Sequence, residues 1–111
     1  GRGERAPVGQ VCPQPMLADG RLRDTVLGLN FAVIGEPAVI EGASDETREH
    51  WQATGVVVMA TRDPEILAWL TQQGVRAVLL RPDRYIAGVA QTGDELDRIS
   101  TLIPAAQVLA H

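Results

Sequence analysis

The stretch VRAVLLRPDRYIAGVA, residues 75–90, contains two apolar runs separated by the charged tetrapeptide RPDR, residues 81–84. Short apolar runs of this kind are typical of buried strands, so Ala77–Leu80 is predicted as one strand and Tyr85–Ala90 as its partner. Proline at the second position of a four-residue turn pre-sets the backbone angle that a type I turn needs. The stretch therefore predicts an antiparallel hairpin.

Upstream of the hairpin, two further apolar runs predict strands on either side of a helix. FAVI, Phe31–Ile34, is bounded by a polar residue and a glycine, and VVVMA, Val56–Ala60, is continuous and β-branched, which predicts a central strand. Between them, Ser44 is placed to cap a helix that has acids in its first turn and ends at Gly55. The segment EPAVIEGA, residues 36–43, is predicted as a loop.

Two more helices flank the hairpin. The tripeptide DPE, residues 63–65, combines a cap, a proline at the first helical position and an acid, and it predicts a helix that ends at Gly74. Thr92 and Glu95 have the spacing of a capping box at the start of the last helix. The predicted apolar face of that helix consists of Leu96, Ile99, Leu102 and Ile103, and Pro104 is predicted to end it.

The predicted order is strand, helix, strand, helix, strand, strand, helix (β-α-β-α-β-β-α). Because a helix joins the first two strands, they are expected to be parallel, with a right-handed crossover, whereas the last two form the antiparallel hairpin. The order predicts an α/β fold, a mixed sheet with helices on both faces, in the arrangement of thioredoxin-like proteins. Residues 1–20 contain four glycines and three prolines without periodicity, so they are predicted as a linker or extended arm, and residues 21–111 as the domain.

The redox chemistry of a thioredoxin-like protein is missing from this sequence. Redox members carry a CxxC motif after the first strand, where the helix N-terminus lowers the thiol pKa. Here residues 34–46 contain no cysteine, and residues 74–80 contain no proline where redox members place one before the third core strand. Cys12 is the single cysteine, so an internal disulfide is excluded. We predict an inert thiol, and a monothiol redox protein using Cys12 stays open as an alternative.

Other catalytic and binding motifs are also missing. His50, His111 and Cys12 match no metal-ligand spacing, and His50 is predicted to be a solvated side chain on a polar helix face. No GxGxxG fingerprint or phosphate-binding glycine loop is present. Trp51 and Trp69 stand at helical positions and are predicted to lie in the core or an interface. We therefore assign no catalytic, cofactor-binding or metal-ligating residue.

The charged turn of the hairpin has a functional and a structural interpretation. Two arginines beside a tyrosine could clamp an anion. Alternatively, the proline pre-sets the turn, the aspartate bonds the turn's own backbone, and the tyrosine packs as a strand residue. Charges so close together in a solvated turn contribute about 0–1 kcal/mol per pair. We favour the structural interpretation, a turn or docking surface made of Arg81, Pro82, Asp83, Arg84 and Tyr85.

Composition narrows the class of protein. The chain is 45% hydrophobic and 22% charged, which is typical of soluble globular domains. Its net charge of -4, without a basic stripe, argues against a nucleic-acid partner. No apolar run approaches the roughly 20 residues that span a bilayer, so no membrane partner is predicted. The N-terminal stretch lacks the apolar core of a signal peptide, and with a single cysteine the predicted location is the cytoplasm.

Three stretches resemble the C-terminal domain of FAD-dependent aromatic-ring monooxygenases. They are GERAP at residues 3–7, LADGRLRDTVLGLNFAVIG at residues 17–35 and WLTQQGVRAVLLRPDRYIAG at residues 69–88. The subgroup most similar to them is the 3-(3-hydroxyphenyl)propionate hydroxylase type, and phenol and polyketide hydroxylases carry related tails. LLRPDRYIAG, residues 79–88, is the most specific piece. The resemblance implies a thioredoxin-like tail without redox cysteines.

The resemblance also implies what the chain lacks and what it accompanies. In that family the flavin motifs lie in an N-terminal domain, and none of them is in this sequence. FAD and NAD(P)H are therefore expected in a full-length parent that acts in aromatic compound catabolism, and no cofactor is expected in this chain. The expected partners are the parent's own FAD-binding and substrate domains, and a homo-oligomer is left open. A free-standing small-molecule binding module remains an alternative.

Overall fold

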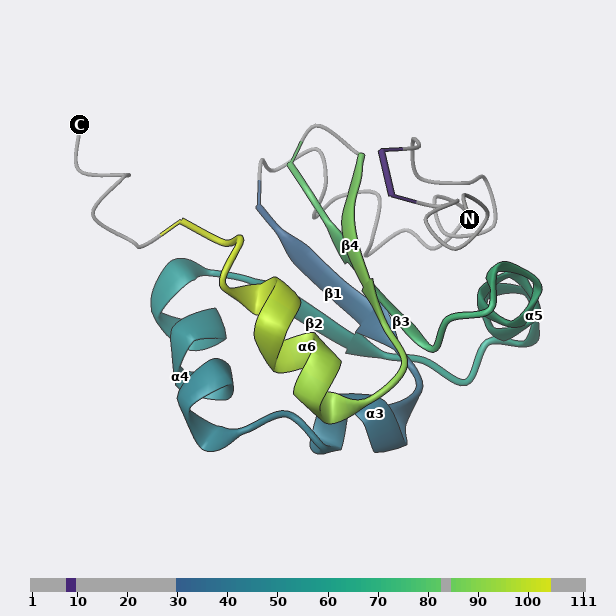
Figure 1. The fold of residues 1–111 in the computed structure, drawn as a ribbon, viewed down its shortest axis with the longest axis horizontal. Helices are drawn as coiled ribbons and strands as arrows, with labels where there is room; N and C mark the ends of the chain where they lie inside the picture. The colour runs from purple at the N-terminus through teal and green to yellow at the C-terminus, as the bar shows by residue number, and fades with distance from the viewer. Residues whose placement is uncertain (1–7, 10–29, 83–84, 105–111) are drawn as a thin grey trace.

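The structure, a computed structural model, describes residues 8–9, 30–82 and 85–104. Four strands form one mixed sheet in the order β2-β1-β3-β4 (Figure 1). Strand β1 is parallel to β2 and antiparallel to β3, and β3 and β4 form an antiparallel pair. The predicted parallel pair, the hairpin and the thioredoxin-like α/β fold are confirmed. The strands are β1 Ala32–Gly35, β2 Val57–Ala60, β3 Ala77–Leu80 and β4 Ile86–Ala90.

The prediction that Val56–Ala60 forms a central strand is wrong. Strand β2 pairs with β1 and lies at an edge of the described sheet, and the central strands are β1 and β3, every residue of which is buried. Val58 in β2 is 40% exposed. A continuous β-branched run indicates a strand, but the position of that strand depends on pairings that no local pattern encodes.

The prediction of a loop at residues 36–43 is also wrong. Residues Pro37–Glu41 form the short helix α3, with proline at its first position and Val39 and Ile40 buried. Arg48 of the next helix donates hydrogen bonds from its guanidinium to the carbonyl oxygens of Ile40 and Glu41, at the end of α3. A helix of five residues depends on such tertiary contacts, because so short a segment is not stable alone.

The remaining helices begin where the caps predict. Helix α4, Asp45–Thr54, is capped by Ser44, and helix α5, Pro64–Gln73, by Asp63. Both end at a glycine in the left-handed conformation, as predicted. Helix α6, Gly93–Ser100, starts at the Thr92 cap.

The last helix ends earlier than its apolar pattern predicts. Helix α6 stops at Ser100, and a tight turn follows in which Leu102 and Ile103 donate to the carbonyl oxygens of Ile99 and Ser100. This turn places Ile103 in the core and leaves Leu102 54% exposed. Leu102 therefore does not belong to the buried face of the helix.

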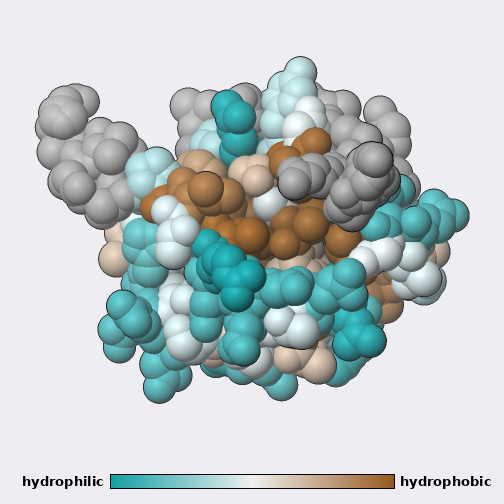
Figure 2. All heavy atoms as spheres, viewed as in Figure 1, coloured by the Kyte–Doolittle hydropathy of each residue, from teal (hydrophilic) through white to brown (hydrophobic). Residues whose placement is uncertain are grey.

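Helices cover both faces of the sheet (Figure 1). Helices α3, α4 and α6 lie on one face and α5 on the other, and each face has its own apolar cluster. In the same orientation, Figure 2 shows polar side chains over α4 and α6, below an apolar band near β4 and the end of α6. The α5-side cluster includes Ile34, Met59, Ile66, Leu70, Val78 and Leu80, and the α6-side cluster includes Val33, Val39, Trp51, Leu79, Leu96 and Ile103.

Candidate functional site

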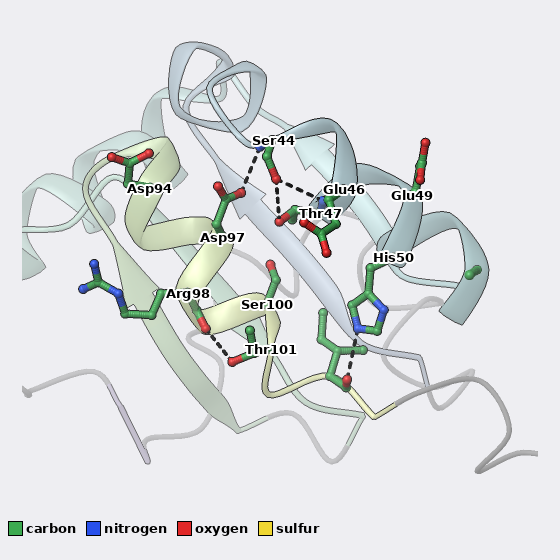
Figure 3. A pocket seen from close by; sticks show the side chains of 12 residues that line it. Ser44, Glu46, Thr47, Glu49, His50, Asp94, Asp97, Arg98, Ser100 and Thr101 are labelled. Carbon is green, nitrogen blue, oxygen red and sulfur yellow. Dashed lines mark hydrogen bonds between the residues drawn. The ribbon is translucent and has the colours of Figure 1, made fainter.

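A groove of about 890 Å³ lies between α4 and α6, on the outer side of the layer that covers the sheet. Figure 3 shows its polar side chains arriving from both helices and from the turn after α6. The groove is lined by Ser44, Glu46, Thr47, Glu49, His50, Ala53, Asp94, Asp97, Arg98, Ser100, Thr101 and Ile103.

At one end of the groove, the N-terminus of α4 is tied to α6. The hydroxyl of Ser44 accepts a hydrogen bond from the backbone amide of Thr47 at 3.1 Å, which is the predicted cap. The backbone amide of Ser44 itself donates to Oδ1 of Asp97 at 2.9 Å (Figure 3). Asp97 on α6 therefore holds the capping residue of α4 in place across a separation of 53 residues.

The environment of Asp97 favours its charged form. Partial desolvation acts to raise the pKa of the Asp97 carboxyl, but the hydrogen bonds from the Ser44 amide and from the Thr47 and Ser44 hydroxyls outweigh it. The net result is a pKa below the ordinary value of 3.8. The carboxylate is thus a structural acceptor that stays ionised at neutral pH.

Beneath the groove, Trp51 and Ser100 join the same two helices in the core. The indole Nε1–H of Trp51 donates to Oγ of Ser100 at 2.9 Å, and the Ser100 hydroxyl donates to the carbonyl oxygen of Leu96 at 2.8 Å. Trp51 and Ser100 are 3% and 2% exposed, so both polar groups are buried and paired. Trp51 was predicted to lie in the core or an interface, and the structure places it in the core. Trp69 is half-buried and packs against the α5-side cluster.

At the other end of the groove, His50 contacts the turn after α6. Its Nε2 lies 3.1 Å from the carbonyl oxygen of Ile103, so this nitrogen carries a proton that it donates (Figure 3). The prediction of a solvated histidine is wrong, because the side chain is half-buried and bonded. The sequence places His50 on a polar helix face, and only the packing of α6 brings a carbonyl acceptor to it.

Polar groups that line the groove make hydrogen bonds within the fold. The hydroxyls of Ser44, Ser100 and Thr101 are all engaged in hydrogen bonds within the fold, Thr101 with the carbonyl oxygen of Arg98. A nucleophilic hydroxyl needs a base that can take its proton, whereas the Ser100 proton is held by a backbone carbonyl. The described residues of the groove join helices, and we assign no catalytic role to them.

The contacts of Asp97 and Ser100 were not predicted from the sequence. Of the two, only Ser100 could have been recognised from the sequence. It interrupts the apolar stripe of α6, and a buried hydroxyl needs a hydrogen-bond partner. Asp97 lies on the polar side of the same helix, where an exposed carboxylate is ordinary. Its role depends on the distant capping residue Ser44, which no local pattern connects to it.

The predicted turn residues lie apart from this groove. The backbone amide of Arg81 donates to the carbonyl oxygen of Tyr85 at 2.8 Å and closes the base of the turn. Arg81 is exposed and Tyr85 is 45% exposed. Asp83 and Arg84 lie outside the described residues, as do Cys12 and all but Val8 and Gly9 of the predicted arm.

The described part of the chain offers neither a cluster of metal ligands nor a membrane-spanning helix. Within residues 8–9, 30–82 and 85–104, no three or more His, Cys, Asp or Glu side chains gather as a metal site would require. In the same part of the chain, no helix is both long and apolar enough to span a bilayer.

The pH dependence of stability is expected to change when Asp97 is replaced by asparagine. Since the folded pKa lies below the ordinary value of 3.8 that the carboxyl has in the unfolded chain, the carboxylate contributes stability that is fully present above that value and is lost as pH falls through the folded pKa. Asp97→Asn should cost about 1 kcal/mol or less at neutral pH. The wild-type and mutant stabilities should converge in strong acid.

Urea unfolding followed by circular dichroism across the acidic range measures this difference. Glu49→Gln, on the exposed side of α4, removes the same charge without a cross-helix hydrogen bond and serves as the control. A stability difference between wild type and Asp97→Asn that does not depend on pH would contradict the assignment.

Comparison with known proteins shows what part of this chain is similar to. The model of the HcaD C-terminal domain matches residues 57–105, which run from β2 through α6. The chain is 28% identical over 132 aligned residues to the 3-(3-hydroxy-phenyl)propionate/3-hydroxycinnamic acid hydroxylase of Shigella sonnei (strain Ss046), and equally to that of Escherichia coli O139:H28 (strain E24377A / ETEC). Each alignment covers 93% of this chain and 24% of the relative.

The chain therefore spans about a quarter of the length of the curated relatives that it matches. No solved structure matches it. The matches confirm the resemblance to the C-terminal domain of 3-(3-hydroxyphenyl)propionate hydroxylases that the sequence indicates.

Proposed function

We propose that this chain is the non-catalytic C-terminal domain of an aromatic-ring hydroxylase that uses FAD and NAD(P)H in the cytoplasm. The observation that carries the proposal is the match of residues 57–105 to the HcaD C-terminal domain. The hydroxylase relatives support it, because the chain corresponds to a quarter of their length. In this proposal the other domains of the parent protein bind the phenolic substrate and carry out the flavin chemistry.

The role that we propose for the domain is docking on the FAD-binding and substrate domains of the parent. The polar groups of the α4–α6 groove hold the two helices together, which suits a rigid body better than a reaction centre. The base of the hairpin turn is closed by the Arg81–Tyr85 backbone bond, and both residues are exposed. This turn is our candidate for the surface that meets the catalytic domains.

The isolated chain is expected to bind neither FAD nor NAD(P)H. The reason is that the sequence lacks the glycine-rich loop that dinucleotide binding requires. Purified protein should be colourless, and titration with FAD should leave the flavin fluorescence unchanged. A flavin absorption band that survives gel filtration would contradict this expectation.

In the full-length hydroxylase, Arg84→Ala is expected to weaken docking or stability without slowing the chemistry. Turnover per bound flavin should stay within a few-fold of wild type, while the Tm falls. Steady-state kinetics normalised to bound flavin measures the first, and thermal unfolding the second. A loss of more than roughly a hundredfold in kcat, about 2.7 kcal/mol in the barrier, with flavin content and Tm intact, would assign the turn to catalysis.

The groove between α4 and α6 favours one alternative, a small-molecule binding module, because its volume of about 890 Å³ is that of a ligand site. Against it, the hydroxyls of Ser44, Ser100 and Thr101 are already bonded within the fold. Binding of 3-(3-hydroxyphenyl)propionate to the isolated chain, with chemical-shift changes at the groove residues, would favour this alternative over docking.

A further inference from the structure

The two edges of the described sheet differ in how they are protected from pairing with another strand. At the β4 edge, the register with β3 is irregular at Leu79/Leu80, and the backbone amide of Gly9 donates to the carbonyl oxygen of Ile86 at 2.8 Å. Bulges and covering segments are the usual means of blocking an edge strand. At the opposite edge, the β2 strand Val57–Ala60 has a regular register and contains no charged residue and no proline.

The backbone of β2 offers hydrogen-bonding groups on its outer side. The amides of Val57 and Thr61 donate to the carbonyl oxygens of Phe31 and Gly35, so alternate residues of β2 face β1. The residues between them, Val58 and Ala60, direct their amides and carbonyls away from the sheet. Both residues are exposed, and these backbone groups have no partner among the described residues.

The side chains of β2 itself, Val57–Ala60, are apolar. Val58 is 40% exposed and borders a groove of about 220 Å³ on the face that carries α3 and α4. Its apolar part is lined by Ile40, Trp51 and Val56 as well, and Glu41, Arg48 and Gln52 form its polar part. A strand added beside β2 would therefore gain apolar contacts on this face in addition to main-chain hydrogen bonds.

The charges at the two ends of β2 are complementary to each other. Arg62 follows the strand, is exposed, and has no ion pair within the described residues. Helix α4 is capped at its C-terminus by Gly55, two residues before the strand, and has no basic residue in its last turn to offset the partial negative charge of that end. When two copies of β2 run antiparallel, each Arg62 lies beside the α4 C-terminus of the other copy.

We propose that a second copy of this chain covers the β2 edge, by antiparallel β2–β2 pairing about a twofold axis at Met59. Val58 of each copy then stands opposite Ala60 of the other, and each such pair exchanges both of its backbone hydrogen bonds. The register places Arg62 opposite Val56 of the second copy, at the end of α4. The pairing joins two four-stranded sheets into one continuous sheet through an isologous contact, the commonest kind in homodimers. This interface does not depend on the proposed hydroxylase role.

Sedimentation equilibrium of the 111-residue chain tests the pairing. The wild type should show a reversible monomer–dimer equilibrium, and Val58→Lys should weaken it at least tenfold, because lysine on an edge strand blocks edge-to-edge pairing. Arg62→Glu should weaken it as well, by placing a carboxylate beside the α4 C-terminus. Leu102→Lys serves as the control. It also replaces an exposed aliphatic side chain by lysine, but away from β2, and it should leave the dimer unchanged. A strictly monomeric wild type, or an equal effect of Leu102→Lys, would overturn the proposal.

Disulfide cross-linking identifies the register. In a Cys12→Ser background, V58C/A60C places two pairs of thiols across the axis with a Cα separation of about 5.5 Å, which suits a disulfide. Mild oxidation should give a covalent dimer, whereas E46C/E49C, on the exposed side of α4, should remain monomeric. A dimer that V58C/A60C fails to cross-link would mean that another surface pairs. Since neither measurement involves flavin or substrate, their failure leaves the proposed function standing.

Discussion

Replacement of Gly93 by alanine is expected to destabilise the fold by about 3 kcal/mol. A Cβ atom at Gly93 would lie 2.1 Å from the carbonyl oxygen of Gly42 and 2.3 Å from its carbonyl carbon. Both obstacles are backbone atoms, so no side-chain rotation relieves the clash. Helices α3 and α6 would have to separate.

Helix propensity alone predicts that the same substitution would make the fold more stable. Gly93 is the first residue of α6, and alanine is a better helix former than glycine by roughly 1 kcal/mol. The sign of the stability change therefore distinguishes the tertiary contact from helix propensity. Urea unfolding followed by circular dichroism at the α-helical band measures it.

Gly42→Ala provides a matched control from the other side of the contact. A Cβ atom at Gly42 would meet its nearest neighbours at 3.4 Å, which is ordinary van der Waals contact, and its φ of -78° suits any residue. This variant should be neutral or more stable by about 0.4–1 kcal/mol, through the reduced entropy of the unfolded chain. A stable Gly93→Ala, or equal losses in the two variants, would show that α3 and α6 are not so closely packed.

Trp51→Ala is expected to lower stability by about 3–5 kcal/mol and the Tm by roughly 10 °C or more. The side chain is 3% exposed and belongs to the α6-side cluster, and its removal leaves a cavity between α4, α6 and the sheet. It also leaves the buried Ser100 hydroxyl without the donor that now stands at 2.9 Å. Thermal unfolding by circular dichroism measures the loss without relying on tryptophan fluorescence.

Two variants separate the contributions of packing and hydrogen bonding. Trp51→Phe keeps a large ring but removes the Nε1–H, so its cost of about 1–3 kcal/mol should fall when combined with Ser100→Ala. Trp69→Ala removes the other tryptophan, which is half-buried, and should cost less than Trp51→Ala. Equal losses for the two tryptophans would mean that α4 and α6 do not depend on Trp51 as the structure indicates.

Local chemistry accounts for what the sequence alone determined about this protein. Ser44, Asp63 and Thr92 cap helices because each side-chain oxygen reaches a backbone amide two or three residues away. Glycines 55 and 74 end helices because their backbone adopts the left-handed conformation at little cost. The hairpin and the parallel pair followed from the order of these elements, and so did the thioredoxin-like arrangement. Interactions of this range can be recognised in a window of a few residues.

The tertiary structure alone decided the features that depend on partners distant in the sequence. Helix α3 forms where a loop is predicted. Val39 and Ile40 are buried in the core, and the Arg48 guanidinium donates hydrogen bonds to the last carbonyl oxygens of the helix. Strand β2 lies at an edge of the described sheet because β3 pairs on the other side of β1. Likewise, Asp97 meets the Ser44 amide across 53 residues, and His50 meets a carbonyl oxygen just as far away. The free energy of each such contact depends on how the helices pack, so no local pattern could have placed them.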